Sequence, residues 1–289
     1  MKAVRPIWFS SGLISVNIYV KPADIMNVFR MIYRAFVVLC IHLATSGIPL
    51  VFGQAVQKAD NFHIYLLLGQ SNMAGRGKIT PEFEALAHAR VFALDAEGRW
   101  VKAKHPLHFD KPKRAGVGPG LSFGIEIAEA DSTIRIGLVP CAVGGTDIEK
   151  WAPGSFDEIT KTYPYDDAVK RLKVAQKYGV IKGVLWMQGE ANSTEKKKRR
   201  YLKKLSKLIS RIRTESNSPD LPFVVSELGR YKERYALINE QLAKLPKKVK
   251  NTWVVSSEGL THKGDGVHLD SRSAHELGIR FARVVRSIR

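Results

Sequence analysis

The sequence has few cysteines and few acidic residues. Two cysteines among 289 residues cannot build a disulfide scaffold. With 23 glycines and 13 prolines, the chain is neither collagen-like nor of low complexity, and a 45% hydrophobic content is too high for a disordered protein. Asp and Glu number 27 against 46 Lys and Arg, so the formal charge is +19. The composition indicates a globular protein with one large domain or two small ones, and its charge favours polyanionic surroundings.

The N-terminal part of the chain has the features of a secretory signal peptide. Residues 35–52 form an uncharged, mostly apolar run of 18 residues, preceded by Arg30 and Arg34. Gly53 and Ala55 follow this run, and a signal peptidase needs small residues at the third and first positions before its cut. We therefore expect cleavage after Ala55 and a secreted or periplasmic protein.

Two alternatives concern the same segment. A signal peptide usually has about 15 to 30 residues, so a start at Met26 or Met31 fits better than Met1, which would then be a mis-assigned start. The apolar run could also stay in place as a membrane anchor, because 18 residues is the lower limit for a membrane span of about 30 Å. His42 and Pro49 interrupt the run and weaken the anchor hypothesis.

Residues 1–55 are therefore expected to be an N-terminal extension with a signal peptide, and residues 56–289 one α/β domain. In that domain, short apolar segments alternate with longer ones whose apolar residues recur every three or four positions, a pattern typical of buried parallel strands and amphipathic helices. The predicted strands are residues 62–68, 134–139, 180–186, 221–226 and 252–256, and the predicted helices are residues 121–130, 166–178, 194–213, 231–243 and 273–288. Residues 89–120 have no helical period and are expected to be a long excursion at the end of the sheet. The alternation predicts a three-layer α/β/α fold around a mostly five-stranded parallel sheet.

Ser71 is the first candidate for chemistry, because functional groups in such a fold gather beyond the carboxyl ends of the strands. It follows the first predicted strand and opens a helix, where free N–H groups and the helix dipole can hold an oxyanion. A serine in this place is more commonly a helix N-cap. Ser71 is thus a candidate nucleophile with a structural alternative.

Asp265 and His268 form a second candidate group. A carboxylate three residues before an imidazole can bond one ring nitrogen and leave the other free as a base. A serine nucleophile needs that arrangement. A lone histidine in a loop is more often a surface or packing residue, so the pair carries the prediction.

Further candidates follow the second and third predicted strands. Gly144 and Gly145 could bring a backbone N–H to an oxyanion, or they could form a simple tight turn. The amide of Gln188 could supply another donor. Glu190 could contact the substrate or support His268, or it could be a solvated loop carboxylate.

Together these residues resemble the SGNH hydrolase superfamily, also called GDSL hydrolases. Within it, the chain resembles sialate O-acetylesterase-like proteins and the acetylxylan esterases of carbohydrate esterase family six. Five blocks in the order of the family carry the resemblance, and they extend from residue 62 to near the C-terminus. The blocks are Gly69-Gln70-Ser71-Asn72-Met73, Gly118-Pro119-Gly120 with Phe123, residues 139–145 with Trp151, Trp186-Met187-Gln188-Gly189-Glu190, and Asp265 with His268.

The resemblance implies a flavodoxin-like fold and a serine esterase. It implies Ser71 as the nucleophile, His268 as the base and Asp265 as the residue that orients the base. The oxyanion hole would consist of the backbone N–H groups of Ser71 and Gly145 and the side-chain amide of Gln188.

The sequence departs from the family pattern in two places. Gln188 stands where the wider superfamily has asparagine, so this donor is one methylene longer. Ala191 and Asn192 stand where the subgroup often has an acidic residue. Glu190 is therefore a candidate to share the role of the acid with Asp265.

The resemblance further implies two-step acyl transfer, with removal of O-acetyl groups from acetylxylan, sialate or another acetylated polysaccharide through an acetyl-Ser71 intermediate. No cofactor is implied, and the histidines do not have the spacing of a metal cluster. The expected partner is an acetylated carbohydrate. A membrane would be a partner only if the signal segment stayed uncleaved.

Two other classes of protein share some of these features. A catalytically inactive carbohydrate-binding protein would keep the fold, but the presence of Ser71, Asp265 and His268 argues against it. Residues 196–213 are rich in Lys and Arg, as in nucleic-acid-binding proteins. These charges fall mostly opposite the apolar helix face that contains Tyr201, so the pattern indicates a solvated surface and no nucleic-acid partner.

Overall fold

The computed structural model describes Met31 and residues 58–288. By its contacts the chain divides into two units, Met1–Ala55 and Val56–Arg289. The predicted signal segment and its cleavage site lie outside the described residues, of which Met31 is the only one before residue 58. None of the helices in the described part is both long and apolar enough for a membrane span.

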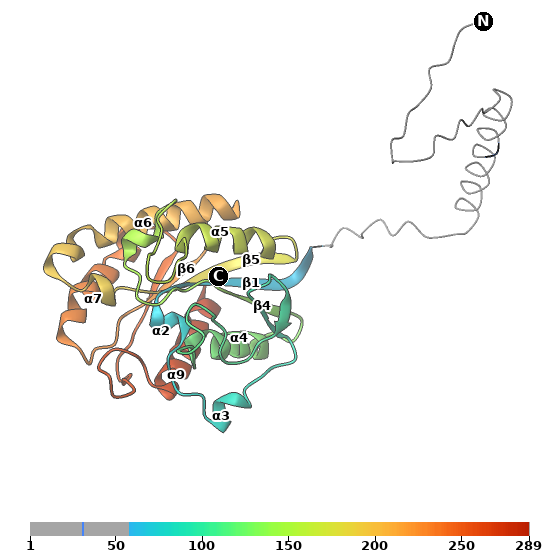
Figure 1. Cartoon of the computed structure of the whole chain (residues 1–289), viewed down its shortest axis with the longest axis horizontal. Helices are drawn as coiled ribbons and strands as arrows, with labels where there is room; N and C mark the ends of the chain where they lie inside the picture. Colours follow the sequence, from blue (N-terminus) through green and yellow to red (C-terminus); the bar gives the residue numbers. More distant parts are fainter. Residues whose placement is uncertain (1–30, 32–57, 289) are drawn as a thin grey trace, which may run out of the picture. The chain divides into compact units, whose positions relative to one another are not determined.

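A seven-stranded sheet forms the centre of the second unit (Figure 1). Its strands are β1 (Ala59–Gly69), β2 (Val91–Leu94), β3 (Trp100–Lys102), β4 (Arg135–Pro140), β5 (Gly179–Met187), β6 (Phe223–Ser226) and β7 (Thr252–Val255). They lie in the order β3-β2-β4-β1-β5-β6-β7, and all neighbours are parallel except β2 and β3. Strands β4, β1, β5, β6 and β7 therefore have the doubly wound order of flavodoxin-like folds.

The prediction of five strands was too low by two. All five predicted strands are present, as β1, β4, β5, β6 and β7. The additional strands, β2 and β3, lie within residues 89–120, where we expected an irregular excursion. They have four and three residues, which is too short for an alternating pattern to stand out, and pairing at the sheet edge decides their structure.

Helices cover both faces of the sheet and give the three layers predicted from the sequence (Figure 1). One face is covered by α5 (Pro164–Ala175), α6 (Glu195–Ser216) and α7 (Ala236–Ala243), and the other by α4 (Pro119–Ala130) and α9 (Ser271–Ser287). The short helices are α2 (Ser71–Ala74), α3 (Pro81–Glu84) and α8 (Leu245–Lys248), and single 3-10 turns are η1 (Ile148–Trp151), η2 (Glu190–Asn192) and η3 (Glu233–Tyr235).

Strand β1 shows how the two faces are built from one sequence. Ile64, Leu66 and Leu68 belong to the core beneath α5 and α6, whereas Tyr65 and Leu67 belong to the core beneath α4 and α9. Successive side chains of a strand point to opposite faces, so a strand covered on both sides reads as a continuous apolar run. Full burial of each leucine or isoleucine stabilises the fold by about 1.5 to 3 kcal/mol. The central strand is thereby a rigid base for the residues that follow it.

Candidate active site

Ser71, His268 and Asp265 lie in one hydrogen-bonded line. The Nε2 atom of His268 is 3.1 Å from the Oγ atom of Ser71, and its Nδ1 atom is 2.7 Å from Oδ2 of Asp265. The other oxygen of Asp265 accepts hydrogen bonds from the backbone N–H groups of Val267 (2.9 Å) and His268 (2.8 Å). The fold has brought together a serine and a histidine that are 197 residues apart. This is the arrangement of nucleophile, base and orienting carboxylate that acyl transfer by a serine requires.

The protonation states suit that arrangement. Burial lowers the pKa of His268, and the hydrogen bond and charge of Asp265 offset this effect only in part. The imidazole is therefore neutral at neutral pH, and a neutral ring can accept a proton. Burial by itself raises the pKa of Asp265, but hydrogen bonds from His268 and Val267 outweigh it and bring this pKa well below its usual range. Asp265 is thus a carboxylate throughout the neutral range.

The turn after β1 presents Ser71 to His268. Gly69 ends the strand with φ +132°, and a Cβ atom there would lie 2.1 Å from the backbone oxygen of Met187 on β5. Only glycine permits this conformation and this approach. The N-cap of α2 is Gln70, and Ser71 is the first residue of the helix. The alternative that Ser71 serves as the N-cap is therefore wrong, and its hydroxyl is directed to His268.

Asn72 holds the loop that carries His268. Its Nδ2 atom donates to the backbone oxygen of Val267 (3.0 Å), and its Oδ1 atom accepts from the backbone N–H of Leu269 (2.9 Å). Both neighbours of His268 are therefore bonded to a side chain on α2. The sequence motif contained Asn72, but nothing in the motif indicated that it reaches a loop near the C-terminus.

Glu190 lies behind Asn72. Its Oε1 atom accepts a hydrogen bond of 2.6 Å from Nδ2 of Asn72, and only 7% of the residue is exposed. Burial raises its pKa. The alternative that Glu190 is a solvated loop carboxylate is therefore wrong. Within residues 58–288, its link to the histidine loop runs through Asn72.

The amide of Gln188 is bonded to other groups, and Gln188 is not among the residues that line the pocket at Ser71. Its Nε2 atom is bonded to Oδ1 of Asn192 (2.7 Å), Oε1 of Gln70 (3.2 Å) and the backbone oxygen of Thr146 (3.2 Å). An amide nitrogen has two hydrogens, so three acceptors leave none for an oxyanion. The fully buried side chain instead joins the segments that follow β1, β4 and β5.

Asp110 is a residue of the site that the sequence did not reveal. Its Oδ2 atom accepts from the backbone N–H of Gly144 (2.8 Å) and from the guanidinium of Arg76 (2.6 Å). The Arg76 and Asp110 side chains are 4% and 3% exposed, respectively, so this is a buried ion pair. Asp110 lies in the stretch without a recognisable period, and no local pattern could have identified it.

The same ion pair explains why the block of residues 139–145 contains Gly144. A Cβ atom there would lie 2.4 Å from the guanidinium of Arg76 and 3.4 Å from the Cβ atom of Ser71. The N–H of Gly144 is occupied by Asp110. Within residues 58–288, the backbone N–H groups of Ser71 and Gly145 donate to no protein group, and both residues line the same pocket.

That pocket has a volume of about 710 Å³, and Ser71, His268, Gly144 and Gly145 form one part of its wall. A volume of this size is typical of small-molecule sites. Among residues 58–288, no three His, Cys, Asp or Glu side chains lie close enough together to hold a metal ion.

Comparison with known proteins gives a consistent result. The family model described as carbohydrate esterase, sialic acid-specific acetylesterase, matches residues 61–287. The chain is 36% identical over 244 residues to a probable carbohydrate esterase of Arabidopsis thaliana, At4g34215, across 76% of this chain and 88% of the plant protein. The X-ray structure of that plant protein superposes with a TM-score of 0.71 at 33% identity, covering 80% of this chain and 99% of the other.

Two more distant structures share the fold. NanS has a TM-score of 0.63 at 19% identity, covering 79% of this chain and 98% of its own. A carbohydrate acetylesterase from Xanthomonas citri has a TM-score of 0.62 at 22% identity, covering 78% of this chain and 56% of its own. These findings confirm both the fold class and the resemblance drawn from the sequence. The chain belongs to the sialic acid-specific acetylesterase family of carbohydrate esterases.

Proposed function

We propose that this protein is a serine esterase that removes O-acetyl groups from carbohydrates through an acetyl-Ser71 intermediate. The observation that carries the proposal is the 3.1 Å contact between His268 Nε2 and Ser71 Oγ, with Asp265 bonded to the far side of the ring. Membership of a carbohydrate esterase family supports the substrate class.

The reaction would proceed in two acyl-transfer steps. The Oγ atom of Ser71 attacks the ester carbonyl carbon while Nε2 of His268 takes the hydroxyl proton. The tetrahedral intermediate then expels the sugar oxygen, which receives that proton from His268. In the second step, water gives a proton to His268 and attacks the acetyl carbon, and Ser71 leaves with the proton as acetate is released. Asp265 keeps the ring in the required tautomer and stabilises the imidazolium.

The negative charge of the tetrahedral intermediate needs donors that are already in place. We assign this role to the backbone N–H groups of Ser71 and Gly145, which line the pocket and donate to no other group among residues 58–288. Gln188 would join them only if one of its two amide hydrogens left its present acceptor. Its proposed role is to hold the loops that carry these donors.

The test is acetate release from acetylated xylan, an O-acetylated sialic acid and p-nitrophenyl acetate, each with wild type and Ser71→Ala. Wild type should hydrolyse the aryl ester and at least one carbohydrate, and the variant should lose this activity while remaining folded by circular dichroism. Activity of Ser71→Ala within about tenfold of wild type would remove Ser71 from the mechanism. Wild type that binds acetylated polysaccharide without releasing acetate would instead be the inactive binding protein.

Export of the protein remains part of the same proposal. It is supported by the basic residues before the uncharged run and by Gly53 and Ala55 after it. The mature protein from its native host should begin at or near Val56, as measured by N-terminal sequencing. A mature N-terminus at Met1, Met26 or Met31 would instead indicate that the segment is retained as an anchor.

A further inference from the structure

The pocket in front of Ser71 has a strongly basic wall. Six of the sixteen residues that line it are Lys or Arg, and one, Asp265, is acidic. In the whole chain, 46 of 289 residues are Lys or Arg and 27 are Asp or Glu. Basic residues are thus more than twice as frequent on the pocket wall as in the chain, so the overall charge of the protein does not explain the pocket.

These basic residues come from three segments that are far apart in the sequence and meet at the pocket. One segment follows α2, one is the turn before α4, and one precedes His268 on the loop to α9. The residues are Arg76 and Lys78, then Lys111, Lys113 and Arg114, and finally Lys263.

Three of the six cations are already engaged within the protein. Arg76 pairs with Asp110 in the buried ion pair. The Nζ atom of Lys111 donates to the backbone oxygen of Gly144 (2.8 Å), and that of Lys263 donates to the backbone oxygen of Arg76 (3.1 Å). Asp110 neutralises the charge of Arg76, whereas Lys111 and Lys263, which bond backbone oxygens, leave their charge on the wall.

The other three, Lys78, Lys113 and Arg114, are exposed. In residues 58–288, none of their side chains forms an ion pair or a hydrogen bond with another protein group. The single acidic residue of the wall, Asp265, is bonded to His268, so it does not neutralise these three cations. Positive charge is thus concentrated around a concave surface with little to neutralise it.

Such a surface attracts anions. A cleft lined by one sign of charge concentrates the field and raises the local concentration of oppositely charged ligands. A single carboxylate is satisfied by one Arg or Lys, whereas three free cations on one wall can hold several anionic groups of a chain. No Phe, Tyr or Trp of the described part lines the pocket, so it lacks the aromatic surface on which a neutral sugar ring could stack.

We propose that the substrate is an acetylated polyanionic polysaccharide, whose sulfate or carboxylate groups bind Lys78, Lys113 and Arg114 while an acetyl group reaches Ser71. This inference rests on the proposed esterase function and adds the charge of the substrate to it. Sulfate and carboxylate share the chemistry that these cations recognise, and the choice of polymer in the experiment separates them.

The first measurement compares kcat/KM for acetate release from acetylated xylan, from the same acetylated xylan after sulfation, and from acetylated polygalacturonate. At about 20 mM NaCl, at least one charged polymer should be preferred over the neutral one by about tenfold, and the preference should shrink several-fold at about 500 mM NaCl, because salt screens exposed charges. A preference confined to sulfated xylan assigns sulfate, and one confined to polygalacturonate assigns carboxylate. Equal rates on neutral and charged polymers would overturn the inference.

The second measurement uses matched pairs of substitutions. Lys113→Gln with Arg114→Gln should lower kcat/KM on the preferred charged polymer by about tenfold more than on p-nitrophenyl acetate, since exposed cations act on a charged ligand mainly through the field. Lys203→Gln with Lys207→Gln, on the exposed face of α6 and away from the pocket, is the control with the same change of charge. Equal losses in the two double variants, or equal losses on the two substrates, would contradict a role for the pocket wall.

The two proposals fail in different ways. If Ser71→Ala abolishes hydrolysis of p-nitrophenyl acetate but wild type shows no preference for charge, the polyanion inference is wrong and the esterase proposal stands. If Ser71→Ala retains the hydrolysis, the esterase proposal itself is wrong.

Discussion

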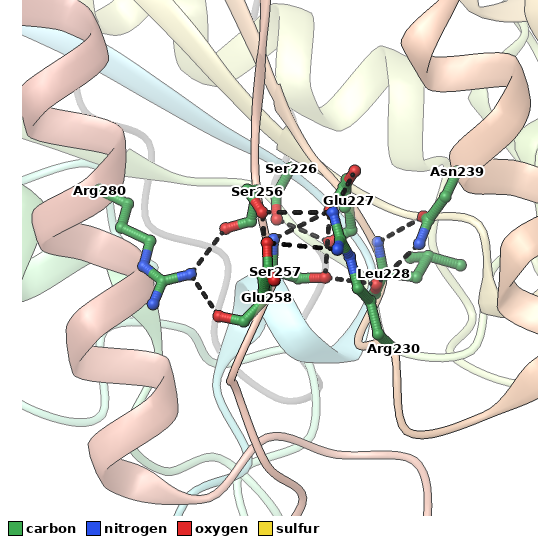
Figure 2. A network of polar contacts seen from close by, with 9 residues as sticks. All are labelled: Ser226, Glu227, Leu228, Arg230, Asn239, Ser256, Ser257, Glu258 and Arg280. Carbon is green, nitrogen blue, oxygen red and sulfur yellow. Dashed lines mark hydrogen bonds and ion pairs between the residues drawn. The ribbon is translucent and has the colours of Figure 1, made fainter.

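Two clusters of serine, carboxylate and basic side chains lie beyond the carboxyl ends of the same sheet. One follows β1 and contains Ser71, Asp265 and His268. The other follows β6 and β7 and contains Glu227, Arg230, Ser256, Ser257, Glu258 and Arg280 (Figure 2). In both, a serine and a carboxylate lie near basic groups, and the residues of the first cluster line a pocket.

In the cluster at β6 and β7, called the closed cluster below, the polar groups are bonded mainly to one another (Figure 2). Glu227 accepts from Arg230 (3.0 Å) and from the backbone N–H of Ser257 (3.1 Å). The hydroxyl of Ser257 donates to the backbone oxygen of Leu228 (2.7 Å), and Ser257 is fully buried. Asn239 bonds both the N–H and the oxygen of Leu228. The buried groups of this cluster, Ser257 and the backbone of Leu228, are bonded within the protein, so the cluster serves to join two strand ends.

The cluster at β1 differs in what remains unused. Ser71 has a neutral imidazole as its hydrogen-bond partner, and its backbone N–H is free among residues 58–288. The residue types of a polar cluster at the edge of a parallel sheet therefore do not by themselves make it an active site. What distinguishes the site is free hydrogen-bonding capacity that faces a cavity.

The largest expected effect separates the two serines. Ser71→Ala should lower kcat on p-nitrophenyl acetate by about 10⁴-fold or more, since the covalent step is lost. Ser257→Ala should leave kcat within about threefold and lower the free energy of unfolding by about 1 kcal/mol, the usual worth of a hydrogen bond. Steady-state kinetics and urea unfolding of both variants give the comparison. A larger kinetic loss in Ser257→Ala would mean that the wrong cluster has been assigned.

The next effect separates the carboxylates. Asp265→Asn should lower kcat by about 10³- to 10⁴-fold, because the ring loses the charge that stabilises the imidazolium. Glu190→Gln keeps an acceptor for Asn72, so it should cost only about 10- to 100-fold, partly in KM. Both are measured on one substrate, with Glu227→Gln as the control from the closed cluster. If Glu190→Gln were the more damaging change, the acid would be Glu190.

The ion pair beside the Ser71 cluster and the ion pair in the cluster at β6 and β7 should contribute differently to the free energy of unfolding. Asp110→Asn leaves Arg76 buried and unpaired, which should lower the free energy of unfolding by about 3 to 5 kcal/mol. Arg230→Gln breaks an ion pair whose arginine side chain is 49% exposed, and partly exposed pairs contribute only about 0 to 1 kcal/mol. Urea denaturation of both variants tests this difference. Equal losses would show that the Arg76–Asp110 pair does not hold the Gly144 loop.

The smallest expected effect is a shift in pH dependence. His268 acts as a base only when it is deprotonated, and its pKa is lowered from 6.5 by burial first and then by Lys263 and Arg76. As the pH falls, kcat/KM should therefore decline around a midpoint below 6.5. Lys263→Gln removes one of these cations and should move the midpoint upward, whereas Lys203→Gln should not move it. A wild-type midpoint above 6.5 would contradict the described environment of His268.

Local patterns were enough to predict most of the fold. The continuous apolar run of β1 indicates a strand that is buried on both faces. The three- and four-residue spacing of apolar residues in α6 indicates a helix that is buried on one face. Both elements are where they were predicted. Strands β2 and β3 carry no such signal, because three or four residues are too few to show a period. Strand β2 pairs with β4, which is distant in sequence, and β3 pairs with β2.

The residues of the candidate site also fall into those that local sequence relations predict and those that only the tertiary structure brings together. The sequence by itself determined Ser71 at a strand end and Asp265 three residues before His268, because these relations are local. Only the tertiary structure decided that Asp110 and Arg76 support the loop at Gly144, and that Asn72 supports the loop at His268. The tertiary structure also decided that the amide of Gln188 takes part in a buried hydrogen-bond network. The physical reason is that a hydrogen bond depends on distance and direction in space, and residues 34 to 195 positions apart acquire these only when the sheet assembles.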